Sequence, residues 1–346
     1  MTLTQRLGIE FPLLQAPMAG VQGSALAIAV AEGGGLGALP CAMLSPQAMS
    51  DELERIRAQT TRPLNVNFFC HLPPEADPDR DARWHQALAP YYGELGLDID
   101  SVPSGAGRRP FDHPACDVLE TFRPEVVSFH FGLPSPALLE RVKAWGATVL
   151  SSATTVEEAL WLEANGADAV IAQGLEAGGH RGMFLTQDLT TQVGTLALLP
   201  QVKAAVSVPV IAAGGIADAR GVAAALALGA DAVQVGTAFL CCPEATTSPL
   251  HRRALQSEAA RHTALTNLYS GRPARGIVTR LMRELGPISA VAPAFPLATA
   301  AIGPLRSAAE ALGSSDFSPL WAGQNASGCR DVPAAELLRE LAREIS

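Results

Sequence analysis

Short apolar runs alternate with longer segments of helical spacing over most of the chain. The short runs are rich in Val, Ile, Leu and Ala and stop at Gly, Pro or polar residues, which is typical of buried strands. The longer segments place apolar residues three and four positions apart, as one face of a helix requires. We predict strands at residues 11–15, 35–40, 63–69, 126–131, 148–153, 169–173, 208–213 and 232–239. We predict helices between them at Ser24–Glu32, Gln47–Ala58, Pro136–Trp145, Val156–Asn165 and Ala219–Leu228.

This alternation predicts a parallel sheet whose strands are joined by right-handed helical crossovers. Glycine marks the return from helix to strand in the repeated phrases that begin at Asn165 and Leu228, each followed by Gly-Ala-Asp-Ala-Val. An open doubly wound sheet stays possible. The eight predicted strands, and the lack of a Gly-x-Gly-x-x-Gly turn after the first of them, favour an α/β fold of the (β/α)8 TIM barrel type.

Two long segments interrupt the alternation. Residues 71–117 are polar and proline-rich, and they predict a cap inserted after the third strand. Residues 241–328 predict a mainly helical second lobe that could close over the strand ends, and the amphipathic stretch Pro333–Glu344 predicts a helix that returns to the barrel. The expected division is barrel at 1–70 and 118–240, cap at 71–117, lobe at 241–328 and C-terminal helix at 329–346.

Composition narrows the class of protein. The 346 residues are 48% hydrophobic and 17% charged, so the chain can bury a large core. A net charge of −9 without a basic stripe argues against a nucleic-acid partner. The chain shows no signal-peptide core and no apolar run of membrane-spanning length, so we expect a cytoplasmic protein without a membrane partner. Six cysteines without Cys-x-x-Cys or His-Glu-x-x-His spacing predict buried thiols and no metal site.

Glycines at two predicted strand ends indicate a phosphate-bearing cofactor. In a parallel barrel the active site lies at the carboxyl ends of the strands, and phosphate is usually held after the seventh and eighth. Gly214-Gly215 follows the seventh predicted strand, and Gly236-Thr237 belongs to the end of the eighth. Both turns offer backbone N–H groups, and Thr237 adds a hydroxyl.

A histidine in a glycine-rich loop is the candidate for proton transfer. His180 follows the sixth predicted strand between Gly179 and Gly182, whereas the other six histidines lie in structural or solvated contexts. Glu176 could orient His180, bond the cofactor or be a solvated loop carboxylate. We expect Arg181 at the surface or in a lid contact.

Amide side chains at strand ends are candidates for holding a polar cofactor edge. Asn67 and Gln173 close the third and sixth predicted strands, while Asn65 is expected to be a hydrogen-bonded core amide. Met18, in the turn after the first strand, could offer backbone contact and a soft apolar surface to a flat ring.

Missing residue types make several kinds of chemistry unlikely. The two lysines, Lys143 and Lys203, lie on predicted outer helices, which argues against a Schiff-base aldolase. No cysteine follows the sixth strand, which argues against a dehydrogenase that attacks its substrate through a loop thiol. The strand ends also lack the clustered carboxylates and histidines that a hydrolytic metal site needs. A redox cofactor is the simplest remaining source of chemistry.

As a set, these motifs resemble the nitronate monooxygenases, formerly called 2-nitropropane dioxygenases, and most closely their bacterial class I branch. The resemblance runs from about residue 8 to the tail and includes the late Trp321-Ala-Gly-Gln324. The motifs that carry it are Ala16-Pro17-Met18, Asn65-Val66-Asn67, the loop from Ala172 to Gly182, Ala212-Ala-Gly-Gly-Ile216 and Gln234-Val-Gly-Thr-Ala-Phe239.

The resemblance implies FMN in a (β/α)8 barrel. The residues implied to hold it are Met18, Asn67, Gln173, Gly178, Gly179, Gly214, Gly215, Gln234, Val235, Gly236 and Thr237. His180 falls on the family's catalytic histidine, and Tyr269 and Arg272 are weaker candidates for contact with substrate.

The implied activity is the oxidation of alkyl nitronates such as propionate 3-nitronate, a form of nitroalkane detoxification. The nitronate would give one electron to FMN, forming a flavin semiquinone, and oxygen would then react to release nitrite and a carbonyl product. His180 would remove the α-proton of a neutral nitroalkane, or help to bind the anion of a nitronate.

Two other interpretations stay open. Flavin-dependent enoyl-acyl-carrier-protein reductases have the same barrel, FMN and a very similar Glu-Ala-Gly-Gly-His loop, and they use NADH or NADPH. A non-enzymatic FMN-binding protein is disfavoured by His180. The sequence leaves open the physiological substrate and whether the protein is a monomer or a homodimer.

Overall fold

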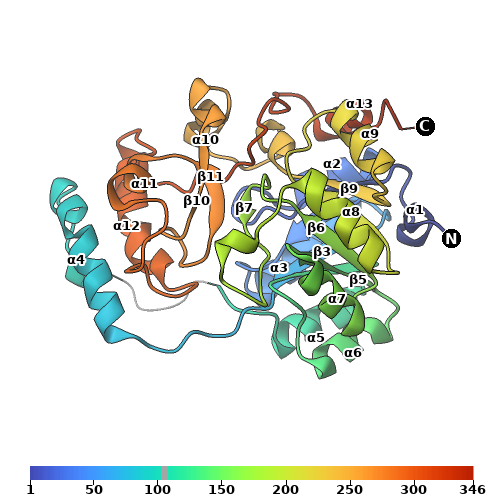
Figure 1. Ribbon diagram of the computed structural model, residues 1–346, viewed down its shortest axis with the longest axis horizontal. Coiled ribbons are helices and arrows are strands. Elements are labelled where there is room, and N and C mark those ends of the chain that lie inside the picture. The colour runs from blue at the N-terminus through green and yellow to red at the C-terminus, as the bar shows by residue number, and fades with distance from the viewer. Residues whose placement is uncertain (103–107, 346) are drawn as a thin grey trace.

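Parallel strands close into a barrel on one side of the molecule (Figure 1). The structure is a computed structural model and describes residues 1–102 and 108–345. Within those residues the eight-stranded sheet has the order β1-β9-β8-β6-β5-β4-β3-β2, and a backbone hydrogen bond from Gln15 N to Leu36 O (3.0 Å) joins its first and last strands. The strands are β1 Leu13–Gln15, β2 Gly37–Pro40, β3 Leu64–Phe69, β4 Val126–His130, β5 Thr148–Ala153, β6 Ala169–Gln173, β8 Val210–Ala213 and β9 Ala232–Val235. The predicted (β/α)8 barrel is confirmed.

Helices cover the outside of the sheet. They are α2 Ser24–Glu32, α3 Pro46–Gln59, α5 His113–Phe122, α6 Pro136–Ala144, α7 Val156–Ala164, α8 Thr195–Ala205 and α9 Ala219–Ala227. The C-terminal helix α13, Ala334–Leu341, packs between α9 and α2 and buries its leucines in the hydrophobic core between the barrel strands and the outer helices. The strand expected at 232–239 is shorter, because the chain turns at Gly236 into the 3-10 helix η3, Thr237–Cys241.

Alternation along β3 shows how the barrel separates its core from its polar end. Leu64, Val66 and Phe68 pack outward in a cluster with side chains of α3 and α5. Asn65 and Asn67 take the opposite face, toward the barrel axis. Asn65 is fully buried, and neither amide atom has a hydrogen-bond partner among the described residues, so the expected satisfied core amide is wrong.

The amino-terminal end of the barrel is plugged with apolar side chains. Helix α1, Leu3–Leu7, contributes Leu3 and Leu7 to a cluster with inward-facing strand residues such as Leu14 and Ile171. Water and ligands are therefore excluded from that end. Any ligand must approach the carboxyl ends of the strands.

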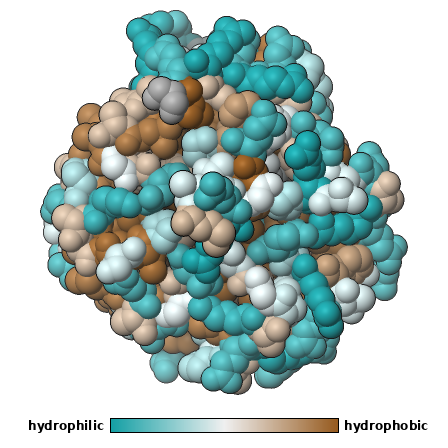
Figure 2. Space-filling model, turned by 90° about the vertical axis from the view of Figure 1, so that its right-hand side faces the viewer, coloured by the Kyte–Doolittle hydropathy of each residue, from teal (hydrophilic) through white to brown (hydrophobic). Residues whose placement is uncertain are grey.

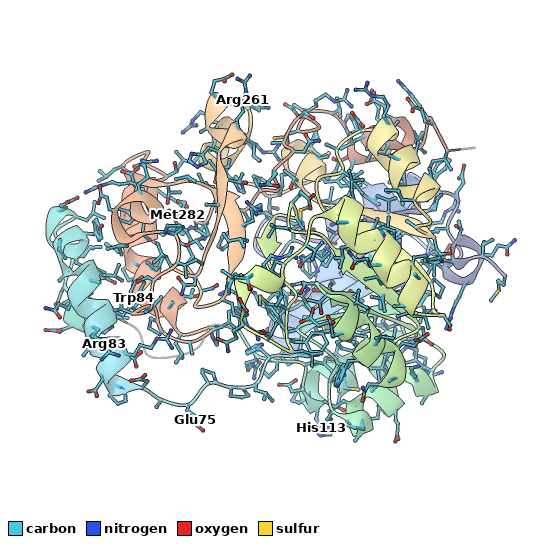
Figure 3. All side chains as sticks on the ribbon, viewed as in Figure 1. Glu75, Arg83, Trp84, His113, Arg261 and Met282 are labelled. Carbon is cyan, nitrogen blue, oxygen red and sulfur yellow. The ribbon has the colours of Figure 1, made fainter. Side chains whose placement is uncertain are left out.

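A second lobe lies beside the barrel and has its own core (Figures 1 and 3). Helix α4, Pro78–Glu94, comes from the predicted cap, while α11, Arg280–Leu285, and α12, Ala298–Ala311, come from the predicted second lobe. They share one hydrophobic cluster, to which Trp84 and Met282 belong. Helix α5 begins at His113 and packs against α3 and α6, so the boundary expected at 117 falls inside a barrel helix.

A small sheet connects this lobe to the barrel. It consists of β10 Thr263–Thr266, β11 Ala274–Ile277 and β7 Gly179–His180, with β11 antiparallel to both neighbours. Since β7 is part of the loop after β6, the sheet carries that loop toward the lobe. Residues 241–328 thus include strands as well as the helices α10, Pro249–Leu255, α11 and α12. The division into domains stays a prediction.

Hydrophilic and hydrophobic residues are intermixed on the face that carries the chain ends (Figure 2). None of the helices in the described part of the chain has the length and apolarity needed to cross a membrane.

Candidate active site

A cavity opens at the carboxyl ends of the barrel strands. Its empty volume is about 1280 Å³, including the space at its mouth. Most of the predicted site residues line it together: Met18, Asn67, Gln173, Gly178, Gly179, His180, Gly214, Gly215, Gln234, Gly236 and Thr237.

Three predicted site residues do not line this cavity. Val235 points into the hydrophobic core, because alternation on β9 turns it away from the side on which Gln234 lies. Tyr269 is buried in the lobe, where its hydroxyl hydrogen-bonds the Thr279 hydroxyl at 2.5 Å. Arg272 lines a neighbouring outer hollow with Phe131.

Glycines line the floor of the cavity, where the lack of side chains lets a ligand or another backbone segment come close to the chain. Gly214 and Gly215 have φ angles of 121° and 73°, which are strained for any side-chain-bearing residue. A Cβ on Gly178 would lie 2.5 Å from the backbone nitrogen of Gly323. That nitrogen donates to the Thr237 hydroxyl at 2.9 Å, so the loop around Gly323 packs against Gly178 and also holds Thr237.

Amide groups supply the polar wall. Asn67 Nδ2 donates to Ser128 Oγ at 3.0 Å, and Gln234 Oε1 is buried without a hydrogen-bond partner among the described residues. Gln173 lines the cavity and also holds the loop: its Nε2 donates to the His180 carbonyl at 3.0 Å and its Oε1 accepts from Gly182 N at 2.7 Å. Gln234 therefore offers an acceptor to a ligand, and Gln173 positions His180.

The buried side-chain amide of Gln22 positions the turn after β1. Gln22 Oε1 accepts from Met18 N at 2.9 Å, and Gln22 Nε2 donates to the Ala38 carbonyl. The Met18 backbone N–H is therefore already engaged within the protein, and the predicted backbone contact of Met18 with a cofactor stays a prediction. Its thioether is what remains for a flat ring, since Met18 lines the cavity.

His180 is held by three hydrogen bonds. Its ring Nε2 lies 2.8 Å from Ser270 Oγ, and its carbonyl accepts from His130 Nε2 at 3.1 Å as well as from Gln173. Pairing of β7 with β11 brings His180 opposite Ala274 and so within reach of Ser270. The antiparallel pairing thus places a hydroxyl next to the ring.

Aromatic rings surround the His180 imidazole. The ring centres of Phe69, Phe131, Phe295 and Trp321 lie 6.0, 6.1, 5.4 and 5.6 Å from it. Burial among them lowers the His180 pKa well below its usual value, and the positive charges of Arg108 and Arg272 lower it further. His180 is therefore neutral near pH 7, with one nitrogen able to accept a proton and the other carrying one.

Two residues near the loop have roles that differ from the expectation. Arg181 is fully buried and donates to the carbonyls of Gln173 (2.7 Å) and Gly174 (2.6 Å), so a surface position is wrong. The Glu176 carboxylate accepts from the backbone N–H (2.8 Å) and hydroxyl (2.9 Å) of Thr195 at the start of α8. It caps that helix and does not bond His180.

Sequence reasoning missed Ser270, Ser128 and Arg108, all of which contact or line the site. Ser128 had a signal, because it alternates with His130 on the inward face of β4. Ser270 lies between the proposed Tyr269 and Arg272, but only the pairing of β7 with β11 reveals which of the three reaches His180. Arg108 comes from the polar insertion, whose local pattern does not indicate a position.

Buried histidines predict a loss of stability in mild acid. Burial lowers the pKa of His71, His130 and His251 to about 4, and that of His180 lies well below its usual value. Between pH 6.5 and 4.5 the unfolded chain therefore binds more protons than the native protein. As the pH is lowered through that window, we expect the free energy of unfolding to fall by up to about 1.4 kcal/mol per histidine for each pH unit.

Urea unfolding at pH 7.5, 6.0 and 5.0 measures this slope. His251→Asn should make the slope shallower by about one histidine, whereas the same change at the exposed His262 should leave it as it is. A stability that is flat or rises as the pH is lowered through this window contradicts the expectation.

Comparison with known proteins places the chain in a family. The family model described as nitronate monooxygenase matches residues 1–344. The nitronate monooxygenase of Pseudomonas aeruginosa is 44% identical over 99% of this chain and 98% of its own length. That of Paraburkholderia phytofirmans is 43% identical over 98% of this chain and 93% of its own length.

Solved structures agree. A nitroalkane oxidase from Streptomyces ansochromogenes is similar with a TM-score of 0.89 and 40% identity, covering 97% of this chain and 96% of that one. FabK from Thermotoga maritima is more distant, with a TM-score of 0.71 and 28% identity over 99% of this chain and 96% of its own. The nitronate monooxygenases are flavin-dependent oxidoreductases, and this chain belongs to the nitronate monooxygenase family.

Proposed function

We propose that this protein uses FMN to oxidise alkyl nitronates of the propionate 3-nitronate type with oxygen, releasing nitrite and a carbonyl product. The observation that carries the proposal is the position of the His180 ring, which is hydrogen-bonded to Ser270 and enclosed by aromatic rings beside a glycine-lined cavity. Membership of the nitronate monooxygenase family supports it.

The polar wall of the cavity fits the edge of a flavin ring. That edge presents an N–H donor flanked by carbonyl acceptors, and the unpartnered Gln234 Oε1 is an acceptor that needs such a donor. Asn67 adds an amide on the same wall. We propose that these two side chains hold the polar edge, with the Met18 thioether against the ring.

The glycine turns fit the phosphate of FMN. Gly214 and Gly215 carry no side chains, so a phosphate can approach their backbone. The Thr237 oxygen already accepts from Gly323 N, which leaves the Thr237 hydroxyl proton free for donation. We propose that these turns bind the phosphate.

Bound FMN supplies one-electron transfer from the substrate and reaction with oxygen. The chain's own groups bind and orient the substrate. The Ser270 hydroxyl can donate to His180 Nε2 or accept from it, so it stabilises either tautomer of the neutral ring. With the ring proton on Nδ1, His180 can donate a hydrogen bond from that nitrogen to a nitronate; with the proton on Nε2, where the Ser270 hydroxyl accepts it, the free Nδ1 can accept the α-proton of a nitroalkane.

The surrounding aromatic rings exclude water from these steps. Phe69, Phe131, Phe295 and Trp321 leave His180 few polar neighbours, which strengthens its hydrogen bond to an anionic group. The same enclosure keeps the imidazole in its neutral form.

We propose the cytoplasm as the compartment. All six cysteines are free thiols in the structure, which fits a reducing environment. The proposed partners are a small nitronate or nitroalkane and oxygen.

Anaerobic mixing separates the proposal from the reductase alternative. The flavin absorbance of the purified protein should change within the mixing time when propionate 3-nitronate is added. NADPH or NADH should change it slowly or not at all. The visible spectrum, recorded in a stopped-flow instrument, is the measurement. Rapid bleaching by a nicotinamide without a response to nitronate would assign the protein to the enoyl reductases instead.

Substitution of His180 separates its two roles. His180→Asn keeps a polar group of similar reach but removes the base, so nitrite release from nitroethane should fall by about 10²- to 10⁴-fold. Turnover of ethyl nitronate, which has already lost its proton, should fall about ten-fold or less. His262→Asn, at an exposed position, is the matched control. Flavin content is measured for each variant, and indifference of both substrates to His180→Asn would indicate a protein that only binds flavin.

A further inference from the structure

Two arginines beside the cavity, Arg108 and Arg272, carry positive charge without a direct ion-pair partner among the described residues. Among the described residues, neither Arg108 nor Arg272 forms a salt bridge. Arg108 lines the cavity, and its Nη1 donates to the neutral Thr299 hydroxyl at 2.9 Å. Arg272 Nη1 is buried without a hydrogen-bond partner in the described part of the chain.

Aromatic rings support both guanidinium groups. The central carbon of Arg272 lies 4.2 Å from the ring centre of Phe131 and 6.0 Å from that of Phe295. The central carbon of Arg108 lies 5.9 Å from the Phe295 ring centre. Such contacts with ring faces hold a cation in place but do not neutralise it.

Both arginines are half-buried, and the partial loss of water around each guanidinium lowers its pKa. No Asp or Glu is found among the described residues that line the cavity. The charged part of its wall is therefore positive only. A wall of this kind binds an anion, and a guanidinium matches the planar shape of a carboxylate.

The position of Arg108 indicates which part of a ligand it meets. Its guanidinium and the His180 ring both flank Phe295, with the His180 ring centre 5.4 Å from that of Phe295. Arg108 and His180 also line the same cavity, so a short molecule bound there can contact His180 with one end and Arg108 with the other. Arg272 lies at the outer hollow, whose lining also includes Glu75, Asp77 and Asp81, so the charged side chain of the cavity wall itself is Arg108.

We propose that Arg108 binds the carboxylate of a dianionic, carboxylated nitronate whose nitronate group lies next to His180. Arg108 is then the residue that makes the enzyme prefer carboxylated over simple alkyl nitronates. The inference rests on the proposed function, because it assigns the second charge of that function's substrate.

The test compares two nitronates that differ by this carboxylate. Propionate 3-nitronate carries it, and propyl-1-nitronate has a methyl group in its place. Wild-type protein should have the higher kcat/KM for propionate 3-nitronate. Arg108→Met should reduce the ratio of the two kcat/KM values by about 10- to 100-fold, mainly through KM for the carboxylated substrate. Both substrates lose some general attraction, so the ratio is the readout.

Matched variants separate the contact from net charge. Arg109→Met removes the same charge from the exposed neighbouring residue and should leave the ratio within about two-fold of wild type. Arg108→Lys should restore part of the preference, because it keeps the charge without the planar fork. Equal losses for both nitronates in Arg108→Met, or no preference in the wild type, would overturn the proposal.

A binding measurement decides the proposal independently of turnover. If the wild type oxidises neither nitronate, the proposed function fails. Anaerobic calorimetry with 3-nitropropionate and 1-nitropropane then tests the subsite alone. Tighter binding of 3-nitropropionate by the wild type, lost in Arg108→Met and kept in Arg109→Met, supports the carboxylate contact. Equal binding of the two compounds by the wild type overturns it.

Discussion

The candidate site depends on one buried cation, the Arg181 guanidinium. It donates to the carbonyls of Gln173 and Gly174, which lie where β6 ends, and to Gln192 Oε1 at 2.8 Å. Left unpaired, these buried carbonyls would each cost about 1–3 kcal/mol. By pairing them, Arg181 turns the chain back after β6, and His180 is the residue immediately before Arg181 in that turn.

The same turn joins the barrel to the second lobe. Gly179 and His180 form β7, which pairs with β11 and brings His180 to Ser270. Buried Glu158 supports the far side of the loop by accepting from Phe184 N and Thr154 N. The hydrogen bonds that pair these backbone groups therefore bring His180, from the barrel loop, next to the Ser270 hydroxyl, from the lobe. Neither half of the molecule holds the histidine alone.

Local patterns in the sequence were sufficient for the barrel. Each strand is a short apolar run, and the predicted helices agree with α2, α3, α6, α7 and α9 to within one or two residues at their ends. Glycine turns that face the cavity were equally visible, because few other roles place Gly214 and Gly215 directly after a buried strand. Strands of a parallel sheet are easy to recognise in a sequence, because both of their faces are covered and they therefore appear as continuous hydrophobic runs.

Contacts between distant segments were not visible. Helices α4 and α12 meet through Tyr92 and Ala301, which are far apart in sequence, so the predicted cap and lobe could not be recognised as one core. Arg181 looks like a surface residue until the unpaired carbonyls of Gln173 and Gly174 are located. Ser270 and Arg108 have no periodicity that indicates function, because their roles come from where the lobe places them.

The central claim is that apolar burial keeps His180 neutral while Ser270 holds its ring. The most direct test is nitrogen-15 NMR of the flavin-loaded protein between pH 8.0 and 5.5, with the His180 signals assigned by their loss in His180→Asn. Throughout this range we expect one protonated and one unprotonated ring nitrogen. An imidazole that takes up a second proton at or above pH 6.5 would contradict the account.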